Sequence, residues 1–72
     1  MGYAIGHYIN IYGKKDVFVM LNEPNDPPTM DQNEEAITAI RLYINDVYSK
    51  KKLEGKLEEI FPYGVQIVER KK

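Results

Sequence analysis

The chain has 72 residues with a net charge of −1, one histidine and no cysteine. This length is that of a single domain with a small core, which packing, regular local structure or a partner subunit must stabilise. The composition excludes disulfides, cysteine-based zinc sites and multi-histidine metal centres, and the near-zero net charge favours no charged partner.

Residues 3–12 show the alternation of a β-strand. The isoleucines and His7 share one parity, whereas Tyr8 and Tyr12 have the other. The polar stretch 13–16 predicts a turn, and the apolar residues 17–21 predict a second strand. Two strands joined by a short polar turn are typical of an antiparallel hairpin.

The alternation leaves two registers of this hairpin open. If Ile11 faces Val17, the isoleucines, His7 and the odd-numbered residues of 17–21 share the core face. The opposite face then holds Tyr8, Tyr12, Phe18 and Met20. A shift of one residue mixes the two sets, because neighbouring residues of a strand point to opposite faces. In both registers one helix covers only one face, so the uncovered face is a candidate partner surface.

Residues 22–28 form a proline-rich loop that cannot continue a strand ladder. It carries two acidic residues, Glu23 and Asp26. One interpretation is a rigid connector from the second strand to the helix. The alternative is a binding loop that the scaffold presents.

Residues 29–53 predict one long amphipathic helix. Its apolar stripe has helical spacing and consists of Ile37, Ile40, Ile44 and Val47. Thr29 and Gln32 fit a capping box at its start, and Gly55 is the expected stop. Lys50–Lys52 would then lie at the negative end of the helix dipole.

After Gly55, residues 56–61 predict a short helical turn that Pro62 ends. Residues 65–69 predict a third strand, and residues 70–72 a frayed tail. We therefore expect one α+β domain over residues 1–72, in the order β-β-α-(short α)-β. Its three-stranded, mostly antiparallel sheet packs on one long helix. A right-handed crossover that sets the third strand parallel to a hairpin strand remains an alternative.

No motif for catalysis, metal binding or a cofactor is present, so we expect no catalytic residue, metal or cofactor. The acidic residues near the helix start lack the glycine and the spacing of a calcium loop. His7 is expected to be a partly buried structural residue, because it lies among isoleucines. A small nuclease or hydrolase that depends on His7 is the third-ranked hypothesis.

Six tyrosines in so short a chain are the most unusual feature of its composition. Tyrosine is enriched at protein interfaces, so the leading hypothesis is a non-enzymatic protein-binding module. A homodimer or pairing at a sheet edge is a related option. By analogy, such a module suits a cytoplasmic regulator or inhibitor of phage or mobile-element origin. The predicted partner-binding residues are Tyr8, Tyr12, Phe18, Met20, Glu23 and Asp26.

The second hypothesis is nucleic-acid binding through the lysines that follow the long helix, namely Lys50, Lys51, Lys52 and Lys56. Residues 36–72 carry eight basic and five acidic residues, against two basic and six acidic residues in 1–35. The slightly acidic total argues against this hypothesis, since nucleic-acid-binding domains are usually strongly basic. The sequence has no membrane-spanning run or signal peptide, so the cytoplasm is the expected location.

Overall fold

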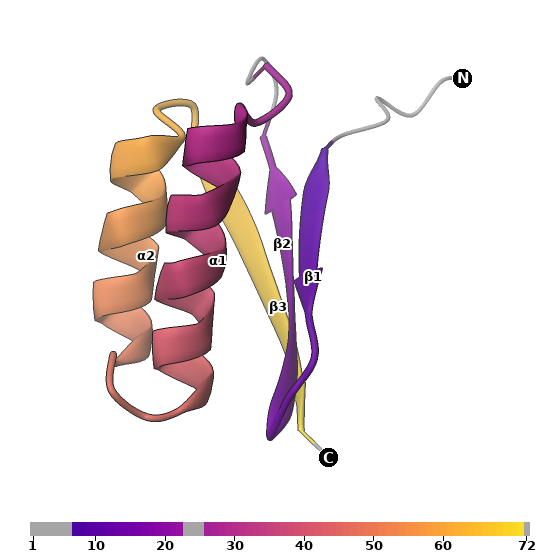
Figure 1. The fold of residues 1–72 in the computed structure, drawn as a ribbon, viewed down its shortest axis with the longest axis vertical. Coiled ribbons are helices and arrows are strands. Elements are labelled where there is room, and N and C mark those ends of the chain that lie inside the picture. The colour runs from indigo at the N-terminus through magenta and orange to yellow at the C-terminus, as the bar shows by residue number, and fades with distance from the viewer. Residues whose placement is uncertain (1–6, 23–25, 72) are drawn as a thin grey trace.

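A three-stranded sheet lies against two helices in a two-layer α+β fold (Figure 1). The computed structural model describes residues 7–22 and 26–71. The elements, in chain order, are β1 (Tyr8–Ile11), β2 (Lys15–Leu21), α1 (Met30–Ile44), α2 (Lys50–Ile60) and β3 (Val65–Lys71). The predicted fold class is therefore confirmed. The predicted first strand began at residue 3, and its residues 3–6 lie outside the described part.

The sheet has the order β1-β2-β3, and both pairs are antiparallel. Ile11 faces Val17 across the hairpin, which confirms the first of the two registers left open. The parallel alternative for the third strand is wrong, because β3 lies antiparallel to β2. The reason is visible in Figure 1, where α1 and α2 run in opposite directions. Two helices return the chain to the end of the sheet that β2 has just reached, so β3 must run back alongside it.

The prediction of one helix over 29–53 is wrong, because α1 ends at Ile44 and a new helix begins at Lys50. Asp46 adopts a left-handed conformation with a φ of 65°, which no α-helix contains. The amides of Val47 and Tyr48 both donate to the carbonyl of Leu42, at 2.8 and 3.1 Å. Val47, which was expected in the apolar stripe, is consequently exposed in the connection between the helices.

Polar caps start both helices. The predicted capping box is confirmed, because Thr29 Oγ1 accepts from the Gln32 amide and Gln32 Oε1 accepts from the Thr29 amide, at 3.1 and 3.0 Å. Ser49 Oγ accepts from the Lys52 amide at 3.1 Å and begins α2. Gly55, the predicted stop, lies inside α2 instead. Pro62 does follow the end of α2, as predicted.

The core lies between the helices and one face of the sheet, here called the inner sheet face. The sheet contributes Ile9 and the odd-numbered residues of β2, and the helices contribute residues one or two turns apart. The buried residues are Ile9, Val17, Val19, Leu21, Ala36, Ala39, Ile40, Tyr43, Ile44, Leu53, Leu57 and Phe61. Val65 and Ile67 of β3 pack against this core from the same face.

His7 precedes β1 and its side chain is exposed. The expectation of a partly buried structural histidine is therefore wrong. Its backbone carbonyl nevertheless extends the hairpin, since it accepts a hydrogen bond of 2.8 Å from the amide of Leu21.

Candidate protein-interaction surface

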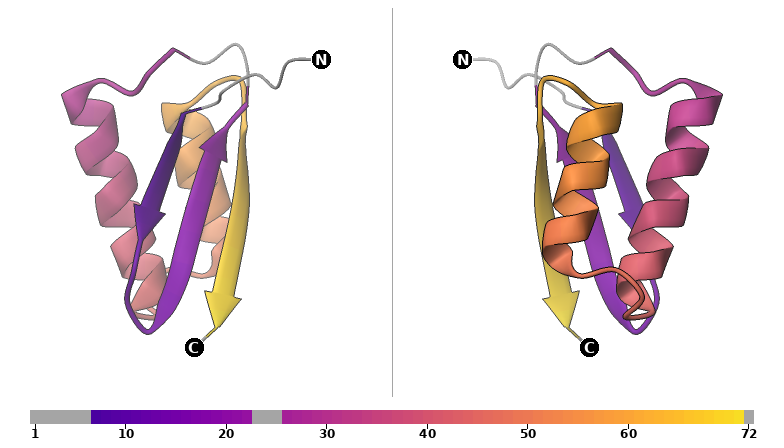
Figure 2. Two further views of the ribbon diagram at one scale, coloured as in Figure 1. Left: turned by 90° about the vertical axis from the view of Figure 1, so that its right-hand side faces the viewer. Right: turned by 90° about the vertical axis from the view of Figure 1, so that its left-hand side faces the viewer.

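Both helices lie on one side of the sheet, and the described part of the chain leaves the other side uncovered (Figure 2). This outer sheet face is formed by the even-numbered residues of the three strands, because side chains alternate along a strand. It carries, with Tyr12 of the turn that follows β1, the residues Tyr8, Asn10, Asp16, Phe18, Met20, Gln66, Val68 and Arg70.

The centre of the outer sheet face is aromatic and apolar. The rings of Tyr8 and Phe18 are stacked, with centroids 4.9 Å apart and planes 25° apart. Phe18 lies opposite Val68 of β3, and Val68 is 53% exposed. Tyr8 and Tyr12 are 60% and 70% exposed. Three large side chains, Tyr8, Tyr12 and Val68, thus remain in solvent on one face, and the ring of Tyr8 is stacked on Phe18.

The polar groups of this face are distributed unevenly. Asp16 and Arg70 are cross-strand neighbours at the end where β3 finishes, and both border a hollow that Tyr12 and Phe18 also line. At the other end Tyr8, Met20 and Gln66 form a row without formal charge. The face therefore combines an apolar centre with a charged rim at one end, as the cores and rims of protein interfaces do.

The structure brings four of the six predicted partner-binding residues onto this face, namely Tyr8, Tyr12, Phe18 and Met20. Glu23 lies outside the described residues. Asp26 borders a separate hollow with Thr29 and Tyr63. Val68 and Arg70 were not predicted to be neighbours of the aromatic residues. The available signal was that Val68 and Ile67 are neighbours in a strand and so point to opposite faces of the sheet. This signal could not be used before the order of the strands was known.

The lysines of the second hypothesis are divided between two environments. Lys50–Lys52 form the exposed first turn of α2. They therefore lie at the positive end of a helix dipole, not at the negative end that was expected. Lys56 is half-buried in the groove between the helices, which Asp31, Glu34 and Glu35 also line.

Opposite charges gather at opposite ends of the molecule. The start of α2, the β1–β2 turn and the end of β3 lie at one end (Figure 1). This end carries Lys14, Lys50–Lys52 and Arg70, and fewer acidic residues, among them Asp16 and Asp46. The start of α1 and the end of α2 lie at the other end, which carries Asp31, Glu34, Glu35, Glu58 and Glu59. Although the net charge is only −1, the antiparallel helix pair places most positive side chains at one end of the molecule and most negative ones at the other.

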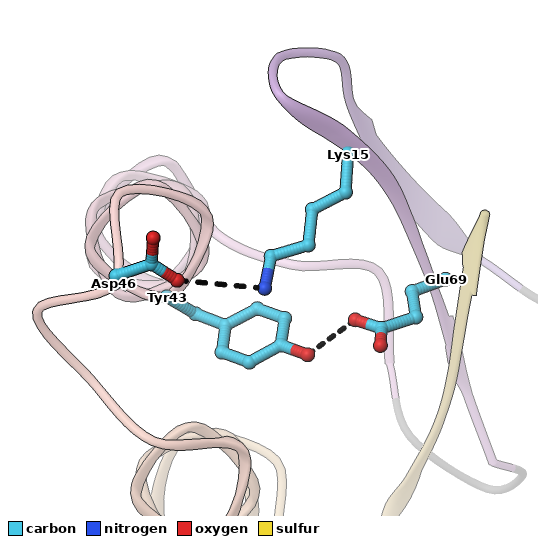
Figure 3. A network of polar contacts seen from close by, with 4 residues as sticks. All are labelled: Lys15, Tyr43, Asp46 and Glu69. Carbon is cyan, nitrogen blue, oxygen red and sulfur yellow. Dashed lines mark hydrogen bonds and ion pairs between the residues drawn. The ribbon is translucent and has the colours of Figure 1, made fainter. Parts of the chain in front are cut away.

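A polar cluster joins the two layers near the basic end (Figure 3). The hydroxyl of Tyr43 in α1 donates to Glu69 of β3. The ammonium of Lys15 lies 4.2 Å from the centroid of the Tyr43 ring and 3.8 Å from Asp46 Oδ1. The hydrogen bond to Glu69, with burial and nearby acidic charges, raises the pKa of Tyr43 from 10.0 to about 12. Tyr43 is buried, so its hydroxyl serves to hold the two layers together.

No metal site is assembled by residues 7–22 and 26–71. This part of the chain contains no group of three histidine, cysteine, aspartate or glutamate side chains that could hold a metal ion. No hydrogen bond or ion pair joins the His7 imidazole to another described side chain. Within the same residues, no helix has the length and apolar character needed to span a membrane.

Comparisons with protein-family models, with curated proteins and with solved structures found no match for this chain.

Proposed function

We propose that this protein is a non-enzymatic binding module whose outer sheet face docks onto an apolar surface of a larger protein. One observation carries the proposal. Both helices pack on the inner sheet face, while Tyr8, Tyr12 and Val68 remain exposed on the outer one. Tyrosine side chains lose little conformational entropy on binding and bury large areas, which is why they recur at the energetic centres of interfaces.

The geometry of the face supports the proposal in two further ways. Stacking against Phe18 fixes the ring of Tyr8 before a partner arrives, which lowers the entropy cost of association. The charged pair Asp16 and Arg70 borders the apolar centre at one end only. It would set the orientation of a partner more than the affinity. A regulator or inhibitor in the cytoplasm that covers part of a larger protein fits this design.

The test is a comparison of two tyrosine variants. Tyr8→Ser with Tyr12→Ser removes two exposed rings from the outer sheet face, and Tyr63→Ser removes one ring of similar exposure, 58%, from the turn before β3. Immobilised wild-type and variant proteins are incubated with host lysate, and captured proteins are quantified by mass spectrometry. We expect a specific partner to be lost with the double variant and kept with Tyr63→Ser. Equal capture by both variants, with circular dichroism confirming the fold, would contradict the proposal.

Nucleic-acid binding is the second candidate, and the gathering of positive charge at one end of the molecule favours it. Lys50–Lys52 lie at the same end as the β1–β2 turn and the end of β3, so they can contact neighbouring phosphates. Fluorescence anisotropy with labelled single- and double-stranded oligonucleotides at about 50 and about 200 mM salt tests this, because phosphate contacts weaken steeply with salt. Replacing Lys50–Lys52 with glutamine should reduce binding and its salt dependence. Lys56→Gln is the control, since Lys56 lies in the groove between the helices.

A further inference from the structure

The outer edge of β3 presents backbone groups that the three-stranded sheet does not use. The Asn22 amide donates to the Gly64 carbonyl at 3.0 Å, and these residues continue the pairing of Leu21 with Val65. In an antiparallel ladder, hydrogen-bonded and non-hydrogen-bonded pairs alternate. The even-numbered residues of β3 therefore bond to β2. The odd-numbered residues Val65, Ile67, Glu69 and Lys71 direct their amides and carbonyls away from the sheet.

The charged side chains that protect an exposed edge are confined to one end of β3, at Glu69, Arg70 and Lys71. β3 has seven residues and contains neither proline nor glycine, and prolines or bulges are common ways of blocking an edge. The views in Figure 2 place α1 beside the β1 edge, whereas α2 lies behind β2 and β3. Among the described residues, none covers the outer side of β3, so a further strand has access to it.

We propose that β3 pairs with β3 of a second copy, antiparallel and about a two-fold axis, to give a six-stranded sheet with four helices on one face. The side chains select the register. An axis at Glu69 or Arg70 would set like charges directly opposite, which is destabilising. A two-fold axis at Val68 avoids this. It pairs the whole strand, so that Val65 of one copy lies opposite Lys71 of the other. Axes at Ile67 or Gln66 give shorter ladders.

An axis at Val68 also gives favourable cross-strand neighbours on the outer sheet face. The two Val68 side chains meet in a non-hydrogen-bonded pair, where side chains approach most closely. This contact removes from solvent a valine that is 53% exposed in one copy. Gln66 of each copy lies opposite Arg70 of the other, so the carbonyl oxygen of its amide can accept from the guanidinium.

The charges of α2 are self-complementary in the same arrangement. α2 runs antiparallel to β3 in the views of Figure 2, so the two-fold axis sets two copies of α2 side by side and antiparallel. The first turn, with Lys50 and Lys51, then lies beside the last turn of the other copy, with Glu58 and Glu59.

This dimer is formed by the strand edge, whereas the proposed function uses the outer sheet face with Tyr8 and Tyr12. The two surfaces meet at Val68, which the dimer would cover. Phe18 is the cross-strand neighbour of Val68, so pairing at Val68 would join the apolar centres of two outer sheet faces into one.

Charge variants at Gln66 test the pairing by sedimentation equilibrium over a range of protein concentrations. The wild-type protein should approach twice the chain mass of 8.4 kDa. Gln66→Lys places like charges opposite Arg70 at two symmetric positions, and we expect the dimer dissociation constant to rise by at least about tenfold. Gln66→Glu creates two opposite-charge pairs and should lower the dimer dissociation constant. Asn10→Lys adds the same positive charge as Gln66→Lys, but on β1, and should leave the dissociation constant unchanged.

Two results would overturn the inference. One is a wild-type protein that remains at the monomer mass up to about 0.5 mM, a concentration at which even weak dimers populate. The other is an Asn10→Lys variant that dissociates as readily as Gln66→Lys, since that would assign self-association to the face and not to the edge. A monomeric wild-type protein leaves partner capture by Tyr8 and Tyr12 unaffected, and the capture experiment does not depend on the edge of β3, so the failures of the two proposals are distinguishable.

Discussion

The hydroxyl of Tyr43 in α1 donates a hydrogen bond to the carboxylate of Glu69 in β3. This contact joins the helical layer to the last strand across the interior of the fold. Glu69 lies on the inner sheet face beside Ile67, where an acidic side chain without a partner would be costly. The hydrogen bond therefore makes a charged residue acceptable at the border of the core.

Removing this hydroxyl should destabilise the fold measurably. Tyr43→Phe keeps the ring but leaves the Glu69 carboxylate without its donor, and we expect a loss of about 1.5–3 kcal/mol in the free energy of unfolding. Urea denaturation followed by circular dichroism measures it. Tyr48→Phe is the control, because the Tyr48 hydroxyl has no hydrogen bond to the described residues, and a change below about 0.5 kcal/mol is expected there. Similar losses in both variants would show that the contact contributes little.

The same contact predicts a loss of stability at high pH. The pKa of Tyr43 is raised from 10.0 to about 12, so the folded state retains a proton that the unfolded state loses. Stability from this source is fully present below about pH 10 and declines as the pH rises through about 12. Unfolding free energies measured across this window should fall less steeply in Tyr43→Phe than in the wild type. Parallel curves would contradict the predicted linkage.

Two glycines should respond to alanine in opposite directions. Gly64 has a φ of 91°, and a Cβ there would lie 3.0 Å from Asn22 Nδ2, so Gly64→Ala should cost about 1 kcal/mol or more. Gly55 lies inside α2 with open space around its Cβ position. Gly55→Ala should therefore stabilise the protein by about 0.5–1 kcal/mol through helix propensity. Thermal unfolding of both variants at the same protein concentration provides the comparison.

The conformation of Asp46 can be tested with two variants that remove the same carboxylate. Both Asp46→Gly and Asp46→Ala lose the exposed ion pair with Lys15, which contributes little. Only alanine keeps a Cβ at a φ of 65°, and this should make it less stable than glycine by about 1 kcal/mol. Equal stabilities would mean that the connection between the helices relaxes out of the left-handed conformation.

Strand alternation was sufficient to predict the hairpin, because a period of two sends neighbouring side chains to opposite sides. It left two registers open, and only the pairing of Ile11 with Val17 decided which side chains share a face. The capping box at Thr29 could also be predicted, since it depends on residues only three positions apart. The break between the helices was not predicted, because Ile37, Ile40 and Ile44 have a spacing that Val47 continues. Asn45 and Asp46 lie outside this apolar stripe, so they also fit the polar side of one continuous helix. Their role as a turn depends on a local backbone conformation that periodicity does not report.

This error accounts for three further ones. With one helix the third strand has a parallel alternative, Lys50–Lys52 lie at a helix C-terminus and Gly55 ends the helix. With two helices β3 must return antiparallel to β2, the lysines begin α2 and Gly55 falls inside it. The hairpin alone predicted part of the outer sheet face. Val68 and Arg70 could be assigned to this face only once the pairing of β3 with β2 was known.

Ser49→Ala distinguishes the two arrangements through the sign of its effect. In the structure Ser49 Oγ accepts from the Lys52 amide and begins α2, so its loss should cost about 1 kcal/mol. Inside one continuous helix the same substitution would be stabilising, because alanine has the higher helix propensity. Thr38→Ala, at an exposed position within α1, supplies the control and should stabilise the protein. Chemical denaturation of both variants gives the two signs. A stabilised Ser49→Ala protein would mean that the chain does not cap a second helix at this residue.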